Sequence, residues 1–376
     1  MNSLGSKVHW TLVLWATVWV GCAYALPPGD EPSSLVRPVH TRPLEDPKLP
    51  LGFSRSVQAC AKCHADEAAS WRQSRHAVAF TNPIFQASWL HWPNGWCLDC
   101  HLPLREAQKE RLGTKAIAGS IHEVQDMSQA GLWDEGVTCT VCHVRAGAIV
   151  TSNPPSREAQ RAHPMEYDPG LSEPEFCGSC HAFPFQNHSP AWPFSYGDTP
   201  AQDTLAEWQT STAAAEGKTC VTCHMGDAGH RFPGAHTPKM IQRTVRVEVS
   251  QASTGRVTAR VQAPGAPHRI PTGDPFRRME LLLCETPRCD VVHEKITMRR
   301  YFSRNDTTWV PTRDTTLPPE TPETPSERVF TRDLSMSIGG YVLRYRYGDA
   351  RFESALLPED VGFVVTSGQV HAEKTR

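Results

Sequence analysis

Five pentapeptides of the form Cys-x-x-Cys-His contain the residues of this sequence best suited to chemistry. In such a motif the two thiols lie on one face of a helical turn, and the histidine that follows projects beside them. This spacing is typical of covalent haem attachment, in which the thiols form thioether bonds and the imidazole ligates the iron. The sequence has 13 Cys and 17 His in 376 residues, so chance would supply about 0.02 such motifs. The motifs therefore predict five haem c groups, with thioether bonds at Cys60, Cys63, Cys97, Cys100, Cys139, Cys142, Cys177, Cys180, Cys220 and Cys223 and proximal iron ligands at His64, His101, His143, His181 and His224.

A zinc site and a redox-active dithiol are the other chemistries that Cys-x-x-Cys pairs support. Zinc ribbons use two pairs for each metal, so five pairs that are each followed directly by histidine fit that arrangement poorly. A thioredoxin-like dithiol would occur once, beside a βαβ pattern. The motifs recur every 37 to 43 residues, but the intervals share no further signature, so no structural repeat is predicted.

Each haem iron also needs a distal ligand, or an open position if the haem is catalytic. Apart from the five proximal histidines and His9, 11 histidines remain for this role. His76 follows His64 by 12 residues, which in a helix is about 18 Å along the axis. That distance is too long to cap the same iron, so His76 is expected to cap a neighbouring haem. The candidates, in order of preference, are His76, His163, His230 and His236, then His122, with His91 and His188 in reserve.

The loop after the fifth motif is suited to presenting imidazoles. It contains three glycines and a proline around His230 and His236, and such a composition favours a tight, shaped turn. His268 opens a turn farther on, where it could hydrogen-bond or ligate across a domain boundary, and the structural role is slightly favoured. Met225 adjoins a proximal histidine and is expected to point elsewhere. Ordinary surface positions are expected for His40, His293 and His371.

Short helices and loops are expected to position the motifs. The clearest helical patterns within residues 57–240 are 65–80 and 205–215, and Pro and Gly interrupt most others. Residues 57–240 are therefore predicted to form a pentahaem cytochrome domain. Haem macrocycles supply apolar surface, which accounts for a hydrophobic fraction of only 39% in so long a chain. Without haem this domain is not expected to fold.

Residues 241–376 have a different pattern. Period-two alternation in 244–250 and 256–261, and strand-like runs at 279–284, 291–302, 340–347 and 361–365, predict a small antiparallel β domain of sandwich type. Cys284 and Cys289 flank a loop of hairpin length, so a disulfide is predicted there, with a pair of free thiols as the alternative. The predicted fold class is α+β, with short helices and loops wrapped around five packed haems and followed by the β domain.

The N-terminus is typical of an export signal. Lys7 precedes an apolar core of 11 residues at 10–20, and Ala23-Tyr24-Ala25 offers a cleavage site, so residues 1–25 are predicted to be removed. Residues 26–56 form a Pro-rich leader. The predicted location is the periplasm or cell surface of a bacterium. Lipidation at Cys22 is the alternative that would attach the chain to a membrane, but Trp19 fits a lipoprotein cleavage site poorly.

Several segments outside the motifs resemble the multihaem c-type cytochromes related to the tetrahaem c-554 type. The resemblance covers about residues 57–280 and implies short helices around packed haems, with distal-ligand roles for His76 and for His230 or His236. The c-554 type has four haems, and its Gly-Pro-Gly-x-x-His pattern is absent after His143, so the pairing of ligands does not follow from the resemblance. The matching segments are 71–77, 136–143, 176–181, 217–225 and 230–234.

These features predict an electron-transfer protein with closely packed, mostly bis-histidine haems. About 185 residues hold all five motifs, and a domain of that size has a radius of gyration of only about 16 Å. The first alternative is a reductase of a small nitrogen or sulfur oxyanion with one open-site haem, although the Cys-x-x-Cys-Lys motif of related pentahaem nitrite reductases is absent. The second is a self-assembling filament subunit. Expected partners are redox proteins or quinol-linked membrane complexes, and the net charge of −2 gives no case for nucleic acid.

Overall fold

The computed structural model describes residues 54–91, 95–108, 111, 131–145, 148–186, 196–305 and 308–373. All of them fall within one contact-defined unit, Pro32–Arg376. The predicted export signal, the leader up to residue 53, Cys22, His40, His122 and His188 lie outside the described residues. Among the helices of the described ranges, none combines the length and apolar character that a membrane crossing requires.

Every Cys-x-x-Cys-His motif lies on or beside a short helix. The first motif joins α1 (Val57–Ala61) to α2 (Ala65–Arg72), and the Ser56 hydroxyl caps α1 by accepting from the Gln58 amide. The other four motifs each end a helix at their histidine, so the helix fixes the direction of the ring. These helices are α4 (Gly95–His101), α6 (Cys139–His143), α8 (Pro174–His181) and α11 (Cys220–His224).

The two helices predicted around the motifs are shorter in the structure. The helix expected over 65–80 ends at Arg72, and the Ser74 hydroxyl accepts from the Ala77 amide to form a turn. The helix expected over 205–215 is two helices, α9 (Thr204–Gln209) and α10 (Thr212–Ala215), because Ser211 caps the second. The remaining helices are α3 (Pro83–His91), α7 (Arg157–Ala162), α12 (Pro238–Thr244) and α13 (Pro358–Val361), with 3-10 turns η1 (Leu132–Glu135), η2 (Pro169–Ser172), η3 (Gly226–Arg231) and η4 (Ala350–Ala355).

The cytochrome region also contains small sheets that the sequence did not predict. One joins β1 (Val144–Arg145), β2 (Ala148–Thr151) and β3 (Met165–Tyr167), and the β2–β3 pair is parallel. The other is an antiparallel pair of β4 (Ala182–Gln186) and β5 (Tyr196–Asp203). Proline interrupts both strands of this second pair, and the register shifts there.

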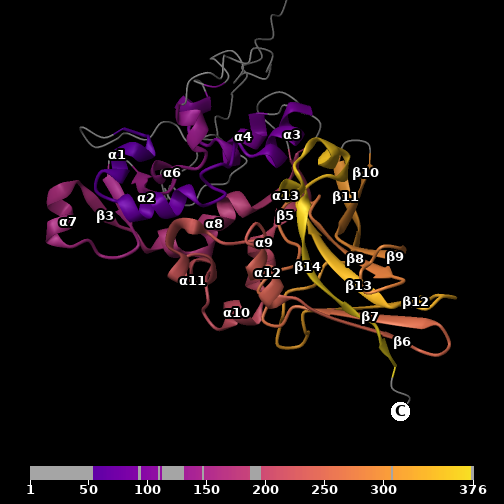
Figure 1. The fold of residues 1–376 in the computed structure, drawn as a ribbon. Coiled ribbons are helices and arrows are strands. Elements are labelled where there is room, and N and C mark those ends of the chain that lie inside the picture. The colour runs from indigo at the N-terminus through magenta and orange to yellow at the C-terminus, as the bar shows by residue number, and fades with distance from the viewer. Residues whose placement is uncertain are drawn as a thin grey trace, which may run out of the picture. The chain divides into compact units, whose positions relative to one another are not determined.

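Two four-stranded sheets occupy the C-terminal part of the chain (Figure 1). Val249, Val257 and Val261 of one sheet and Leu281 and Leu343 of the other belong to the same buried cluster, so the two sheets share a core. Neighbouring strands are antiparallel except for a two-residue parallel pair of β15 with β6. The first sheet has the order β12 (Glu327–Asp333), β7 (Arg256–Gln262), β6 (Arg246–Gln251), β15 (His371–Ala372), and the second β14 (Gly362–Gln369), β13 (Gly340–Arg346), β8 (Arg278–Cys284), β9 (Val292–Met298).

The mixed α+β class predicted from the sequence is therefore confirmed. All seven residues of β8 are buried, including Arg278 and Glu280, whose side chains form an ion pair. A separate hairpin consists of β10 (Arg300–Asn305) and β11 (Thr308–Asp314). The loop after β8 is closed by a disulfide between Cys284 and Cys289, whose Cα atoms lie 4.9 Å apart.

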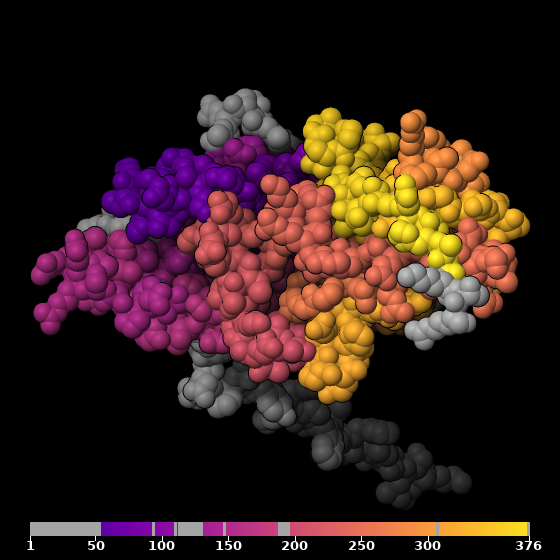
Figure 2. Space-filling model, turned by 60° about the horizontal axis from the view of Figure 1, so that its bottom comes forward, coloured from indigo at the N-terminus to yellow at the C-terminus, as the bar shows by residue number. Residues whose placement is uncertain are grey.

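The cytochrome region and the β region contact each other directly. The Thr212 amide donates to the Glu320 carbonyl oxygen over 2.9 Å, and Ile84 of α3 packs against the core that the two sheets share. In Figure 2 the residues near 200–240 lie between the indigo and magenta surface and the orange and yellow surface. The boundary predicted near residue 240 therefore separates two regions that differ in secondary structure and contact each other. That it is a domain boundary stays a prediction.

Candidate haem centres

Backbone carbonyl oxygens orient several of the motif histidines. A carbonyl only accepts, so each contact requires a proton on Nδ1 and leaves the lone pair of Nε2 for a metal. This is the orientation that a proximal haem ligand needs. The contacts of this kind in the described residues are His101 Nδ1 to Ala79 O at 2.7 Å, His143 Nδ1 to Val150 O at 3.0 Å and His224 Nδ1 to Pro233 O at 2.6 Å.

At His101, His143 and His181 burial favours the neutral imidazole, which is the form that binds a metal. Burial lowers the pKa of His101 to about 4 and the pKa of His181 to about 3. It also lowers the pKa of His143. His181 nevertheless retains accessible surface.

Four of the five proximal histidines face a second imidazole. If an iron lay between two such rings, with each metal–nitrogen bond about 2.0 Å and each ring nitrogen about 1.1 Å from its ring centre, the centroids would be about 6.2 Å apart. The observed separations agree with this value, so the residues present fit an iron held from both sides. The pairs and their centroid separations are His64 with His163 (6.4 Å), His181 with His76 (6.4 Å), His143 with His230 (6.1 Å) and His224 with His268 (6.3 Å).

Three of the four best-ranked distal candidates, His76, His163 and His230, lie in these pairs, and the fourth does not. His236 stacks on the Tyr347 ring at 3.9 Å instead, and no ring contact in the described residues joins it to a proximal histidine. Desolvation in this position, beside Arg75 and Arg277, lowers the pKa of His236 to about 2.

His268 also lies beside a proximal histidine, although its sequence context slightly favours a structural role. Its ring lies 6.3 Å from that of His224, and burial lowers the pKa of His268 to about 4. The His268 Nδ1 contacts the Arg269 carbonyl oxygen at 3.0 Å, which requires a proton on Nδ1 and leaves the lone pair of Nε2 for a metal. Three prolines around this segment, Pro267, Pro271 and Pro275, are a sequence feature that points to a rigid presentation of His268.

His101 differs from the other proximal histidines. Its ring stacks on Phe85 with the centroids 4.0 Å apart and the planes within 17°. Among the described residues no imidazole has a ring contact with His101. The reserve candidate His91 packs its ring against Phe352 at 5.2 Å.

Thiols of different motifs adjoin one another, and these contacts give the spatial order of the attachment sites. The hydrogen-bonded side chains link the first motif to the third, the second to the fourth, and the fourth to the fifth. The order in space therefore differs from the order in the sequence. The pairs are Cys60 with Cys139, Cys100 with Cys180 and Cys177 with Cys220.

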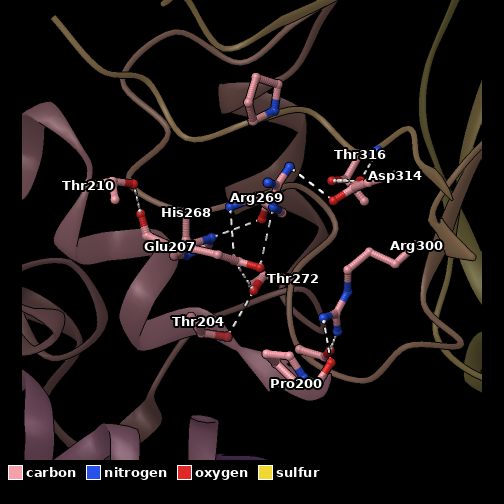
Figure 3. Close-up of polar contacts among 12 residues, drawn as sticks. Pro200, Thr204, Glu207, Thr210, His268, Arg269, Thr272, Arg300, Asp314 and Thr316 are labelled. Atoms are coloured by element: carbon pink, nitrogen blue, oxygen red, sulfur yellow. Dashed lines mark hydrogen bonds and ion pairs between the residues drawn. The ribbon is translucent and has the colours of Figure 1, made fainter. Parts of the chain in front are cut away.

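A polar network surrounds the segment that carries His268 (Figure 3). Glu207 of α9 accepts from the Thr272 hydroxyl at 2.6 Å and from the Arg269 amide at 3.2 Å. The Arg269 guanidinium also lies 3.1 Å from the Asp314 carboxylate. Burial raises the pKa of Glu207. A cavity of about 390 Å³ adjoins Glu207 and Arg269 and is also lined by Arg300.

Comparisons with known proteins support the fold. No protein-family model matches the chain, and no curated protein matches its sequence. In structure it is similar to a penta-heme cytochrome c552 from Thermochromatium tepidum, with a TM-score of 0.60 and 20% identity over 89% of this chain and 99% of that one. A superoxide reductase (neelaredoxin) from Ignicoccus hospitalis covers 35% of this chain at 12% identity, and its TM-score of 0.17 carries no argument. The predicted resemblance to multihaem c-type cytochromes is thus confirmed in the fold, and the chain has the fold of a pentahaem cytochrome c.

Proposed function

We propose that the chain is an exported pentahaem c-type cytochrome that transfers electrons between redox partners. The observation that carries this proposal is the set of four facing imidazole pairs, each at a separation suited to one iron. Four iron sites enclosed in this way favour electron carriage over chemistry on a substrate. A haem iron held by two imidazoles exchanges single electrons and offers no open position.

The protein residues have three tasks in this function. The ten motif cysteines tether five haems, and the five motif histidines supply the proximal ligands. The distal imidazoles come from segments far away in sequence: His163 serves the first motif, and His76 serves the fourth. The low pKa values imposed by burial keep the buried imidazoles in the ligating, neutral form.

The contacts between thiols support a branched path for electrons. Motifs 1 and 3 adjoin, as do motifs 4 and 5, and motif 2 adjoins motif 4. Cys142 of motif 3 also interacts electrostatically with Cys180 of motif 4, which joins the two groups into one path with motif 2 as a branch. At the two ends of this arrangement Cys63 and Cys223 are exposed. Haems tethered at exposed cysteines have an edge near the surface, so we propose that electrons enter and leave at the first and fifth motifs.

Export of the chain is part of the same proposal. Covalent haem attachment in bacteria follows translocation, and a disulfide between Cys284 and Cys289 suits an oxidising compartment. We therefore propose the periplasm or cell surface as the location. Redox proteins or quinol-linked membrane complexes remain the proposed partners, and lipidation at Cys22 or self-assembly would change only how the cytochrome is held there.

Mass analysis of the protein exported from a host competent for cytochrome maturation tests this proposal. We expect the mature polypeptide plus five haems, and full oxidation and reduction of all five by small mediators. A polypeptide of unmodified mass, or one that carries metal ions in place of haem, would contradict the proposal.

A second candidate function has one observation in its favour. His101 stacks on Phe85 and has no ring contact with another imidazole among the described residues. A haem at the second motif with an open distal position could bind a small molecule, which is the requirement of the reductase alternative. Substitution of His101 by Met should then abolish any nitrite or sulfite reduction and leave the other four haems low-spin. Reductase activity that survives this change would exclude the second motif as its site.

A further inference from the structure

Glu207 joins the cytochrome region to the turn that carries His268. Its side chain is only 7% exposed, and one carboxylate oxygen, Oε2, accepts from the Thr272 hydroxyl at 2.6 Å and the Arg269 amide at 3.2 Å. The other oxygen, Oε1, lies 3.8 Å from Arg269 Nε. The amide in question belongs to the peptide bond between His268 and Arg269, so the carboxylate holds the backbone directly beside the imidazole (Figure 3).

The helix that carries Glu207 is itself fixed on a haem motif. Leu205 of α9 packs so closely on Gly178, inside the fourth motif, that a Cβ at Gly178 would lie 2.5 Å from the Leu205 side chain. The Thr204 hydroxyl, on the same helix, contacts the Thr272 hydroxyl at 2.8 Å. Helix α9 therefore connects the turn at 268–272 to the fourth motif, because it contacts both.

The turn has other supports, but they act farther from the His268 backbone. Ile270 and Leu317 exchange two backbone hydrogen bonds, at 3.0 Å and 2.9 Å. The Arg269 guanidinium forms its ion pair with Asp314 through the far end of a long side chain. A buried carboxylate is costly unless donors satisfy it. The groups that donate hydrogen bonds to Glu207 lie in this turn, so the carboxylate and the turn stabilise each other.

We propose that Glu207 is a positioning residue that holds His268 as the distal ligand of the fifth haem. This inference rests on the proposed bis-histidine ligation of that haem. His268 Nδ1 donates to the Arg269 carbonyl oxygen, which fixes the tautomer, and Glu207 fixes the backbone from which the ring extends. The β region then supplies a ligand to a cofactor of the cytochrome region, and the contact with Glu207 holds the His268 ring in position.

The test compares six forms of the holoprotein: wild type, Glu207→Ala, Glu207→Gln, Thr272→Val, His268→Ala and the control Glu216→Gln. The readouts are the high-spin signal of the oxidised protein in electron paramagnetic resonance and carbon monoxide binding by the reduced protein. His268→Ala should add one high-spin haem. Glu207→Ala removes two hydrogen bonds to a charged group, so carbon monoxide should bind one additional haem roughly tenfold to a hundredfold more tightly than in wild type.

The milder variants keep the proposal testable if Glu207→Ala fails to fold. Glu207→Gln retains an acceptor oxygen and should rescue most of the wild-type behaviour, whereas Thr272→Val should give an intermediate increase in affinity. Glu216→Gln is the matched control, because Glu216 is an exposed carboxylate that pairs with Lys218 near the fifth motif. It should leave both readouts unchanged.

The outcomes separate this inference from the proposed function. If His268→Ala adds no high-spin haem, the ligand pairing at the fifth motif is wrong. If His268→Ala adds one and neither Glu207→Ala nor Thr272→Val changes carbon monoxide binding, the pairing stands and the positioning role of Glu207 is overturned. An equal effect of Glu216→Gln would also overturn it, because the response would then be a general effect of charge.

Discussion

The positions of the histidine rings decide what each proposed haem of this chain could do. Four proximal rings face an imidazole, and the fifth, His101, faces Phe85. The same residue type also serves without a metal, since His236 packs on Tyr347. The number of histidines in the sequence therefore overstates the number of ligands, and only the position of each ring separates the two uses.

The ligand assignment can be tested at single residues. Replacing His163 or His230 by Ala should convert one haem to the high-spin form. Each ring lies opposite a proximal histidine, with a centroid separation (6.4 Å and 6.1 Å) that suits one iron between the two rings. The measurement is the high-spin signal of the oxidised holoprotein. Replacing His236 by Ala is the control and should add no high-spin haem. A high-spin haem in the His236 variant alone would reverse the assignment.

The buried His236 should also make the stability of the protein depend on pH. Desolvation lowers the pKa of its folded form to about 2, whereas the unfolded chain takes up a proton below about pH 6.5. The unfolded state then binds more protons, so the free energy of unfolding should fall as pH decreases below 6.5, by up to about 1.4 kcal/mol per pH unit.

His236→Phe keeps a ring against Tyr347 and removes this titration. Urea unfolding between pH 7 and pH 4 should therefore show a flatter pH dependence for the variant than for wild type. Parallel curves for the two proteins would mean that His236 is protonated in the folded state or that other groups dominate.

At the scale of elements, short helices present the motifs and backbone turns present the distal rings. Gly136 ends η1 with φ at +57°, and a Cβ there would lie 2.5 Å from the His76 carbonyl oxygen. The Val137 amide donates to the same oxygen at 2.9 Å. The backbone beside His76 is thus held by the approach of residues 136–137, which only glycine permits at the first of these positions.

Gly136→Ala should therefore destabilise the protein by more than the cost of the backbone conformation alone and should loosen His76 from its haem. Gly217→Ala is the matched control, because Gly217 has φ at +72° and nothing within 4 Å of an added Cβ. We expect about 1 kcal/mol for the control. Gly136→Ala should lower the free energy of unfolding by more than Gly217→Ala does and should add a high-spin haem. Equal losses, with all haems unchanged, would show that the approach to His76 has no effect on ligation.

The sequence predicted those elements whose pattern depends on local chemistry. Alternating apolar residues predicted β6 and β7, and the run at 279–284, apolar except for Glu280, predicted β8, since each is dictated by which faces are buried. Among the strands that the sequence missed are β12 and also β4, β5 and β11, of which the last three contain Pro184, Pro200 and Pro311 and owe their pairing to tertiary contacts.

The candidate sites divide in the same way. The thioether and proximal positions follow from covalent spacing and need no knowledge of the fold. His268 could not be ranked from sequence, because its role depends on a turn held by Glu207 from a distant helix. The order of the attachment sites could not be predicted from the sequence, since it is set by contacts between cysteines 43 or more residues apart.

On the scale of the whole molecule, segments far apart in sequence are interlaced around the iron sites. The region between the third and fourth motifs supplies His163 to the first, the segment after the first supplies His76 to the fourth, and the β region supplies His268 to the fifth. All these segments belong to the single contact-defined unit of residues 32–376.

The central claim is that four irons are each enclosed by two imidazoles of this chain. Electron paramagnetic resonance of the fully oxidised holoprotein, with spins counted against the haem content, tests it directly. The structure predicts four low-spin haems with bis-histidine signals, and at most one high-spin haem, at the second motif, which His101→Met should alter. Two or more high-spin haems in the unmodified protein would contradict the account.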